Sequence, residues 1–188
     1  MTILLTLLMA APKPIITIDD GPYYKHHHKT LQLLTKHKVK AIWFVNGHFL
    51  WKKQNQKLLK TIVACGHRLG NHTLRHRSPC KLTAAAFKRS LRRNERIVNR
   101  VLKRPLNTRM RWYRPPFGHL CHTKLARRLG YRVLLWHDGD IGRTTNQLIR
   151  TVLRQHRRKP PRRSILLFHY HNHKLAAVLN KFFPLVSP

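Results

Sequence analysis

Acidic residues are scarce in this 188-residue chain, in which five Asp and Glu stand against 39 Lys and Arg and the formal net charge is +34. So large a positive charge predicts attraction to polyanions such as nucleic acid, anionic lipid or acidic wall polymers. The Lys and Arg are spread along the chain, whereas a dedicated nucleic-acid module more often concentrates them on one element. We therefore interpret the charge as a chain-wide bias rather than as the main functional signal.

Cysteines and long apolar runs are also scarce. The three cysteines, Cys65, Cys80 and Cys121, are odd in number and widely spaced, and no Cys-x-x-Cys pattern occurs. These features exclude a thiolate zinc site and argue against a disulfide framework, so we predict that the cysteines are small packing residues. No segment reaches the roughly 20 apolar residues that a transmembrane helix needs.

The first eleven residues are mostly apolar and end in Met-Ala-Ala. We interpret residues 1–11 as a signal-peptide remnant or as an N-terminal strand. A signal would make the protein extracytoplasmic or secreted, and without one it would be cytoplasmic. The chain length corresponds to one domain and no repeat or internal linker is visible, so residues 12–188 are predicted to form a single domain.

Short apolar runs alternate with amphipathic stretches along the chain. We predict strands at residues 15–18, 41–45, 131–136 and 164–168. We predict helices at residues 29–37, 56–65, 83–103, 123–129, 146–156 and 173–183. Thr83 is a candidate N-cap, and Gly66 and Gly130 follow predicted helix ends. This alternation favours an α/β fold of parallel strands joined by helices.

Four of the five acidic residues form two doublets after apolar runs. Asp19 and Asp20 follow the strand predicted at 15–18 and precede a Gly-Pro pair, and Asp138 and Asp140 follow a later predicted strand. The C-terminal ends of strands commonly carry catalytic groups in α/β folds. The alternative for the first doublet is an ordinary turn, because Asp, Gly and Pro all favour turns.

Histidines number 15, and two of them have the spacing of metal ligands. His72 and His76 can bind one metal if their segment is helical or tightly turned. His169 and His173 share this spacing, and in so histidine-rich a chain such a pair can arise by chance. The histidine run at 26–28 is interpreted as a solvated face or an incidental metal binder.

Two further motifs carry candidate polar groups. In Arg-Pro-Pro-Phe-Gly at 114–118 the prolines stiffen the backbone and could aim Arg114 inward, where a guanidinium can hold a carboxylate. The alternative is a surface loop in an arginine-rich chain. His169 ends the apolar run at 164–168, although a lone histidine at a strand end is more often structural than catalytic.

Taken in order, these motifs resemble those of the polysaccharide deacetylase family, carbohydrate esterase family 4. They are Asp-Asp-Gly-Pro, His-Thr-x-x-x-His, Arg-Pro-Pro-Phe-Gly, an acid at a strand end, and Leu-x-His. The segments at 39–47 and 66–73 also resemble the family's second strand and its lead-in to the histidine motif. The resemblance spans residues 14–183 and implies a distorted (β/α) barrel, incomplete at the C-terminus, with residues 12–188 as the catalytic domain.

The resemblance also implies a metal site and a substrate site. It assigns one divalent metal to Asp20, His72 and His76. Zinc fits these N and O ligands best, with cobalt, nickel or manganese as alternatives. The residues that it places at the substrate are Tyr23, Pro116, Phe117, Trp136 and Leu167.

The acid–base groups follow from the same resemblance. Asp19 matches the general base and Arg114 the residue that orients it. His169 matches the general acid, which is tuned by Asp140 or, as the less secure alternative, by Asp138.

The implied activity is metal-dependent removal of acetyl groups from N-acetylated sugars, in peptidoglycan or in chitin-like oligosaccharides. Peptidoglycan is preferred because a cationic enzyme would concentrate on an anionic wall. Two alternatives stay open: an O-deacetylase of the acetyl-xylan type, and a catalytically inactive basic protein that binds nucleic acid or other polyanions. We expect a monomer.

Two positions depart from the family pattern. Ile141 stands where a Trp often follows the fourth-motif acid, and Tyr170 stands where an acidic residue usually follows the catalytic histidine. The first change would alter the apolar wall of the acetyl pocket. Neither removes a metal ligand, the base or the acid, so we expect an active enzyme.

Overall fold

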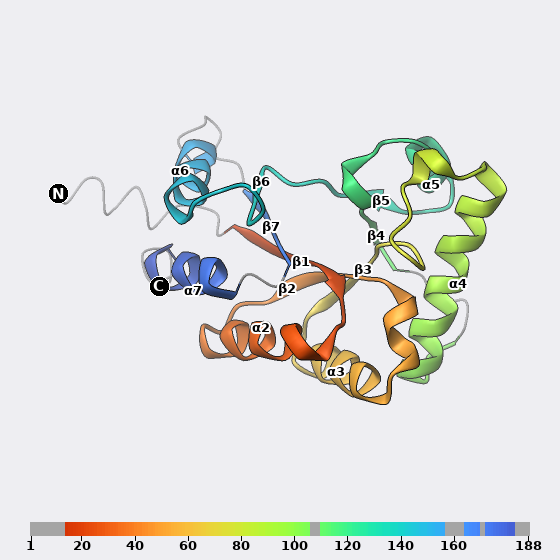
Figure 1. Ribbon diagram of the computed structural model, residues 1–188, viewed down its shortest axis with the longest axis horizontal. Helices are drawn as coiled ribbons and strands as arrows, with labels where there is room; N and C mark the ends of the chain where they lie inside the picture. Colours follow the sequence, from red (N-terminus) through yellow and green to blue (C-terminus); the bar gives the residue numbers. More distant parts are fainter. Residues whose placement is uncertain (1–13, 106–109, 157–163, 170–171, 183–188) are drawn as a thin grey trace. The chain divides into compact units, whose positions relative to one another are not determined.

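Strands and helices alternate along the chain in the computed structural model, which describes residues 14–105, 110–156, 164–169 and 172–182 (Figure 1). The predicted signal remnant or strand at residues 1–11, and Tyr170, lie outside the described residues. The strands are β1 (Ile15–Gly21), β2 (Ala41–Val45), β3 (Arg68–Asn71), β4 (Trp112–Tyr113), β5 (Arg132–Val133), β6 (Asp138–Gly139) and β7 (Ile165–Phe168). The helices are α2 (Tyr24–Lys36), α3 (Lys53–Ala64), α4 (Ala84–Leu102), α5 (Thr123–Arg128), α6 (Thr145–His156) and α7 (Asn172–Phe182), with short 3-10 turns η1 (Gly47–Trp51), η2 (Pro79–Lys81) and η3 (Pro116–Gly118).

The chain forms two compact units. The central unit contains Ile18–His28 and Ile42–Leu135, and the terminal unit contains Met1–Thr17, Lys29–Ala41 and Trp136–Pro188. In the central unit the strand order is β5-β4-β3-β2-β1, and the pairs from β2 to β5 are parallel. In the terminal unit the strand order is β1-β7-β6, where only the first residues of β1 belong to this unit. Strands β6 and β7 pair in parallel. The predicted parallel α/β arrangement is therefore confirmed in each unit.

Strands with an apolar run were predictable, whereas the shortest ones were not. Strand β2 has the predicted bounds, and β1, β5 and β7 overlap the predicted ranges. Strands β3, β4 and β6 were missed. They contain two to four residues, and β3 and β6 include Gly, Arg or Asp, so only pairing with neighbouring strands defines them.

All six predicted helices are present, and the predicted end signals hold. The Thr83 hydroxyl accepts a hydrogen bond from the Ala86 N–H at 3.2 Å, which caps the start of α4. Gly66 and Gly130 follow α3 and α5 with φ of 76° and 91°, a left-handed conformation that glycine adopts without steric cost.

Helix α2 begins five residues before its predicted start, and the histidine run lies inside it. The prediction of a solvated face is wrong for His27, which is 2% exposed and whose Nδ1 accepts a hydrogen bond from the Tyr23 N–H at 3.0 Å. The Tyr24 N–H donates to Asn55 Oδ1 at 2.8 Å. Asn55 is 31 positions away, so a local pattern cannot reveal how the first N–H group of the helix is satisfied.

The predicted absence of disulfides is also wrong. Cys80 and Cys121 form a disulfide with their Cα atoms 5.0 Å apart, although 41 positions separate them in sequence. Cys80 lies in η2 and Cys121 lies just before α5, so the bond joins two loops of the central unit. Its formation depends on folding rather than on any local cysteine spacing. Cys65 is half-buried at the end of α3.

The core of the central unit lies against α4. Phe87 and Leu91 of this helix are fully buried and cluster with Tyr113, Ala126 and Tyr131. Apolar residues one turn apart on a helix form a face that packs inward. Among the described residues, no helix is long and apolar enough to cross a membrane.

Candidate metal centre and its acid–base groups

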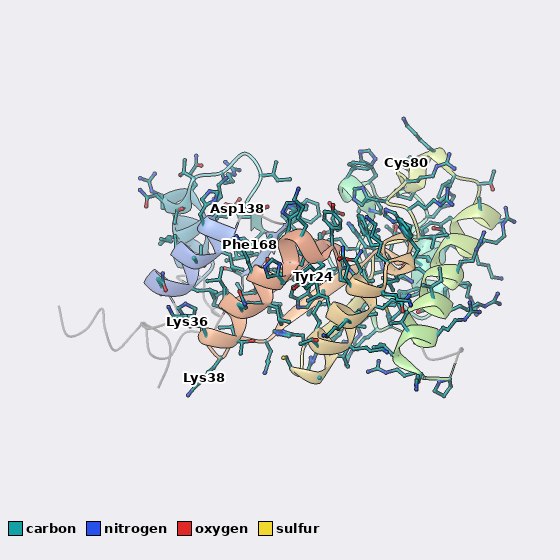
Figure 2. The ribbon with its side chains drawn as sticks, turned by 60° about the horizontal axis from the view of Figure 1, so that its bottom comes forward. Tyr24, Lys36, Lys38, Cys80, Asp138 and Phe168 are labelled. Atoms are coloured by element: carbon teal, nitrogen blue, oxygen red, sulfur yellow. A yellow bond between two sulfur atoms is a disulfide. The ribbon has the colours of Figure 1, made fainter. Side chains whose placement is uncertain are left out.

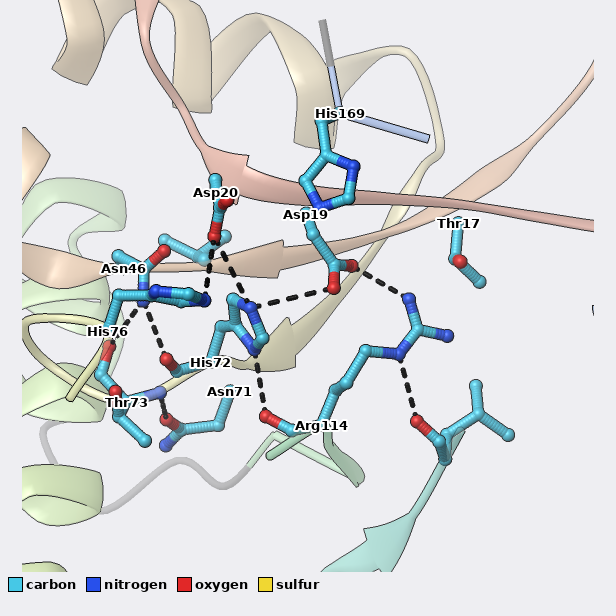
Figure 3. Close-up of polar contacts among 12 residues, drawn as sticks. Thr17, Asp19, Asp20, Asn46, Asn71, His72, Thr73, His76, Arg114 and His169 are labelled. Carbon is cyan, nitrogen blue, oxygen red and sulfur yellow. Dashed lines mark hydrogen bonds and ion pairs between the residues drawn. The ribbon is translucent and has the colours of Figure 1, made fainter. Parts of the chain in front are cut away.

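Three potential metal ligands of the central unit lie together at the C-terminal ends of β1 and β3 (Figure 3). One ligand atom from each of Asp20, His72 and His76 lies within 4.8 Å of the other two. The distances from Asp20 Oδ1 are 3.4 Å to His72 Nε2 and 3.3 Å to His76 Nε2. These are the three residues predicted to bind a metal.

This donor set fits a divalent metal. Two ligand atoms that bind one zinc ion at about 2.0–2.2 Å in tetrahedral geometry lie roughly 3.4 Å apart, which matches both measured distances. One carboxylate and two imidazoles also leave a coordination position open, as catalytic zinc sites require. Zinc, cobalt, nickel and manganese all accept such N and O ligands.

The orientation of His72 is fixed by a backbone carbonyl. His72 is 2% exposed, and its Nδ1 lies 2.8 Å from the carbonyl oxygen of Arg114. A carbonyl can only accept, so Nδ1 carries the proton and donates. In the neutral ring, Nε2 then has the lone pair that a metal needs.

Three buried asparagines hold the backbone around His72. Asn46 Nδ2 donates to the carbonyl oxygens of His72 and Thr73 at 2.6 and 3.1 Å, and the Thr73 N–H donates to Asn71 Oδ1 at 3.0 Å. Asn94 Nδ2 reaches the same Asn71 Oδ1 at 2.7 Å. Sequence reasoning missed this network. The only available signal was the position of Asn46 and Asn71 at the ends of β2 and β3.

The two candidate ligand histidines come from a tight turn and not from a helix. Thr73 and His76 have φ of 69° and 51°, in the left-handed region that few non-glycine residues adopt. A helix or a tight turn would allow two histidines four positions apart to bind one metal, and this segment forms the turn. The side-chain hydrogen bonds to the Thr73 backbone stabilise this strained conformation.

Asp19 and Asp20 both reach the same histidine, although they are neighbours in a strand. Successive side chains of a strand point to opposite faces. Asp20 departs from strand geometry with φ of 60°, so Asp19 Oδ2 and Asp20 Oδ1 lie 3.5 and 3.4 Å from His72 Nε2. The left-handed residue at the end of β1 therefore places two carboxylates at one site.

Asp19 forms a buried ion pair with Arg114, as Figure 3 shows. Arg114 Nη1 donates to Asp19 Oδ1 at 2.7 Å, and the two residues are 0% and 2% exposed. The guanidinium also donates through Nε to the carbonyl of Leu134 at 2.9 Å and through Nη2 to that of Leu135 at 3.1 Å. The prediction that Arg114 points inward is confirmed, and its alternative as part of a surface loop is wrong.

The environment of Arg114 is aromatic on one side. Its guanidinium lies 4.2 Å from the centre of the Phe44 ring, a cation–π distance. A Cβ at Gly70 would come within 2.5 Å of that ring, so only glycine fits there. Burial lowers the pKa of Arg114, while the charge and hydrogen bond of Asp19 raise it. Arginine stays protonated at neutral pH, so the ion pair persists.

Three residues predicted to contact the substrate belong to the central unit. Phe117 is 62% exposed, and its ring centre lies 4.6 Å from that of the ligand His76. Pro116 is buried just before it, and Tyr23 is half-buried, with its ring 5.6 Å from Phe49. Of these three, Phe117 is the one with a described ring contact to a candidate metal ligand.

The terminal unit holds the remaining predicted groups. His169 Nδ1 lies 2.8 Å from Asp140 Oδ1, and the His169 N–H donates to Asp140 Oδ2 at 2.8 Å. Asp138 instead accepts hydrogen bonds from Thr151 Oγ1 at 2.5 Å and from Arg143 Nε at 3.2 Å. Of the two candidate acids, Asp140 is therefore the one that contacts the histidine.

The other residues predicted in the terminal unit lie on or near its strands. Leu167 is buried in β7 and its carbonyl accepts from the Asp140 N–H at 3.0 Å. Trp136 is half-buried, and Ile141 is 65% exposed. Their contacts with a substrate stay predictions.

Comparisons with known proteins identify relatives of this chain. The model of the family described as polysaccharide deacetylase matches residues 10–134. A peptidoglycan-N-acetylglucosamine deacetylase of Bacillus cereus is 29% identical over 64% of this chain and 54% of its own length. The peptidoglycan-N-acetylmuramic acid deacetylase PdaA of Bacillus subtilis is 31% identical over 64% of this chain and 45% of its own length. The chain thus spans about half of these relatives.

Solved structures share the fold over nearly all of the chain. A peptidoglycan N-acetylglucosamine deacetylase superposes with a TM-score of 0.74 at 25% identity, over 94% of this chain and 82% of its own. A pseudoenzyme of carbohydrate esterase family 4 from Bacillus anthracis superposes with a TM-score of 0.73 at 22% identity, over 94% of this chain and 62% of its own. The predicted fold class, the distorted (β/α) barrel of these deacetylases, is confirmed. With a family model matching more than half of its length, the chain belongs to the polysaccharide deacetylase family.

Proposed function

We propose that this protein is a metal-dependent N-deacetylase that hydrolyses the acetamide of N-acetylated glycans. The observation that carries the proposal is the Asp20, His72 and His76 ligand group, with the Arg114-bound carboxylate of Asp19 beside it. Family members with and without activity share the fold, so the argument rests on the groups in the site. The chain has three candidate ligands, a candidate carboxylate base and a candidate acid.

The metal ligands of the central unit define the reaction type. A divalent metal at this site would acidify a water molecule and polarise the acetamide carbonyl. Asp20, His72 and His76 would hold it, with zinc as the preferred ion. Hydrolysis of the acetamide yields acetate and a free amino sugar.

Asp19 is proposed as the general base. A base must be unprotonated, must not serve as a ligand, and must lie within reach of the water proton. One carboxylate oxygen accepts from Arg114, while Oδ2 lies 3.5 Å from Nε2 of the ligand His72. Arg114 fixes the rotamer, and the second oxygen remains available for the proton.

His169 is proposed as the general acid that protonates the departing amine. Both oxygens of Asp140 are engaged with His169, one with Nδ1 and one with its backbone N–H. This arrangement makes Nδ1 a donor to the carboxylate, so that Nε2 is the nitrogen that delivers a proton.

The proposed substrate is an N-acetylated wall glycan. The relatives are named for N-acetylglucosamine and N-acetylmuramic acid of peptidoglycan, and one from Sinorhizobium fredii is named a chitooligosaccharide deacetylase. The net charge of +34 favours accumulation on an anionic wall polymer. A location outside the cytoplasm suits the Cys80–Cys121 disulfide, because disulfides persist in oxidising compartments. We propose a monomer with salt-sensitive polyanion binding.

Metal analysis combined with acetate and free-amine release on a panel of glycans tests the proposal. The panel contains chitin oligomers, peptidoglycan fragments and acetyl-xylan. We expect about one metal per chain and deacetylation of at least one N-acetylated glycan. His76→Ala should lose both the metal at micromolar protein and the activity, whereas His37→Ala, a histidine outside the site, should keep both.

The contrary outcomes are equally specific. Release of acetate from acetyl-xylan alone would replace the proposal with an O-deacetylase. Full metal occupancy in His76→Ala would overturn the ligand assignment. A metal-loaded protein that releases acetate from no glycan but binds nucleic acid selectively would be a binding protein on an inactive barrel.

A further inference from the structure

A cavity of about 240 Å³ in the central unit is lined by four arginines: Arg75, Arg77, Arg89 and Arg93. Ser90 lines it as well, with apolar side chains that include Leu74. All four arginines are exposed. We refer to this cavity as the arginine pocket.

The arginine pocket lies between the metal-ligand turn and α4. Arg75 and Arg77 are the two sequence neighbours of the ligand His76. Arg89 and Arg93 are four positions apart on α4, so they lie on one face of the helix. Figure 2 shows the nitrogen tips of basic side chains projecting from this helix.

The two walls of the arginine pocket are held together. Ser90 Oγ accepts a hydrogen bond from the N–H of Leu74 at 3.1 Å, which ties the turn to the helix. Two residues further along the turn comes the ligand His76. The backbone segments that carry the two pairs of arginines are thus linked to each other beside His76.

No carboxylate of the described residues lines the arginine pocket. The chain has five acidic residues, all of them within the described parts, and none lines this cavity. Each has other hydrogen-bond or ion-pair partners: Asp19 with Arg114, Asp20 with His72 and His76, Glu95 with the Met110 N–H, Asp138 with Thr151 and Arg143, and Asp140 with His169. Four like charges around one cavity repel one another unless an anion is bound.

We propose that the arginine pocket is a subsite for an oxyanion, a carboxylate or phosphate group carried by the glycan whose acetamide is hydrolysed. The inference rests on the proposed deacetylase function and extends it to the substrate class, an N-acetylated glycan with an anionic substituent. Guanidinium groups bind both oxyanions through paired N–H donors. The hydroxyl of Ser90 adds a neutral polar group to the same lining.

The position of the arginine pocket explains how it would act on hydrolysis. Arg75 and Arg77 flank His76 in sequence, so two residues that line the pocket have Cα atoms about 3.8 Å from that of a candidate metal ligand. An anionic group bound there restrains the sugar next to the reacting acetamide. A neutral oligomer lacks this contact and relies on the rest of the site.

A charge-matched pair of double variants tests the subsite. Arg89→Gln with Arg93→Gln removes the two helix arginines of the pocket. Arg96→Gln with Arg100→Gln is the control, because these two are also exposed, lie on α4 with the same spacing and do not line the pocket. Both variants lose the same net charge, so a general attraction of the basic surface affects them equally.

The readout is kcat/KM on a neutral chitin oligomer and on a peptidoglycan fragment with free carboxylates, at fixed ionic strength. We expect the Arg89 and Arg93 variant to lose on the order of tenfold or more on the anionic fragment, as for a lost charged hydrogen bond, and to be unchanged on the chitin oligomer. The control should change little on either. Equal losses in both variants, or equal losses on both substrates, would overturn the subsite.

Calorimetric titration with sulfate, and separately with inorganic phosphate, measures anion binding without catalysis. Binding that weakens in the Arg89 and Arg93 variant but not in the control supports the pocket, and equal binding in both overturns it. Should wild-type protein deacetylate no glycan at all, the proposed function fails while this titration still decides whether the pocket binds oxyanions. If phosphate binds to the pocket but kcat/KM shows no preference for the anionic glycan, the pocket binds free phosphate. Its role as a substrate subsite would then be overturned.

Discussion

The central and terminal units each bury a carboxylate beside a basic side chain, but the two pairs are proposed to act through different atoms. In the central unit, one oxygen of Asp19 accepts a hydrogen bond from Arg114, whose Nε and Nη2 donate to the carbonyls of Leu134 and Leu135. In the terminal unit, both carboxylate oxygens of Asp140 form hydrogen bonds with His169. We propose that the first pair accepts a proton through the second carboxylate oxygen of Asp19, and that the second pair donates one through the imidazole of His169.

The identity of the partner accounts for this difference. Arginine cannot release a proton in the accessible pH range, so the Asp19–Arg114 pair can act only through its carboxylate. Histidine exchanges protons near neutral pH, so a carboxylate bound to it orients the ring and stabilises the charged form. The same residue type, aspartate, thus serves as the proposed base in one unit and as a positioning residue in the other.

Asp19→Asn gives the largest expected change and tests the base. The amide keeps the volume and can still accept from Arg114, but it cannot take a proton from water. Turnover should fall on the order of 10²-fold or more, the usual contribution of a general base. Metal content should stay at the wild-type value when measured on the same sample.

Asp20→Asn is the matched control for Asp19→Asn, since it makes the same chemical change one residue further along the strand. A neutral amide is a weaker ligand, so this variant should lose metal. The opposite pattern, in which Asp19→Asn loses metal and Asp20→Asn keeps it, would exchange the roles of the two neighbours.

Asp140→Asn should have a smaller effect, because it weakens the orientation of His169 without removing the imidazole. We expect kcat to fall roughly tenfold, a fraction of what a general acid contributes, with KM and metal content unchanged. Asp138→Asn alters the carboxylate bonded to Thr151 and Arg143, so it should lower thermal stability and leave kcat near wild type. Equal losses of kcat in the two variants would remove the distinction between the acids.

The sequence predicted the parts of the fold and site that are encoded locally. The apolar run of β2 and the amphipathic pattern of α4 each specify one element, and both were placed within a residue of their bounds. The three candidate metal ligands and Arg114 were singled out because they belong to short motifs, and the structure brings the three ligand atoms together. These features depend on neighbours in sequence, which a linear pattern retains.

The missed features depend on contacts between distant segments. Strand β4 has two residues and exists because it pairs with β3 and β5. Asn94 reaches Asn71 across 23 positions, and no periodicity indicates such a contact. Asp138 and Asp140 are two positions apart, so alternation along an extended chain gives both the same face. The contact of Asp140 with His169 is what distinguishes the two carboxylates.

The Cys80–Cys121 disulfide lies in the central unit alone, so removing it tests whether the metal ligands depend on that bond. The two loops it joins are also linked by a hydrogen bond between Ser78 and His119 at 2.8 Å and by one from His122 Nε2 to the Leu82 carbonyl at 2.8 Å. Cys80→Ser with Cys121→Ser should therefore retain the metal and most of the turnover at 25 °C. The free energy of unfolding should fall by about 2–4 kcal/mol, because the unfolded chain gains loop entropy.

Denaturant unfolding with and without reductant, together with metal analysis, measures both quantities. Cys65→Ser is the control, since this cysteine lies outside the disulfide, and it should respond to reductant as the wild type does. If the double variant stays folded but releases its metal, the disulfide supports the ligand turn directly, and the asparagine network around His72 is not sufficient to hold it. Retained metal in a less stable protein would mean that the local hydrogen bonds position His72 and His76 while the disulfide stabilises the unit as a whole.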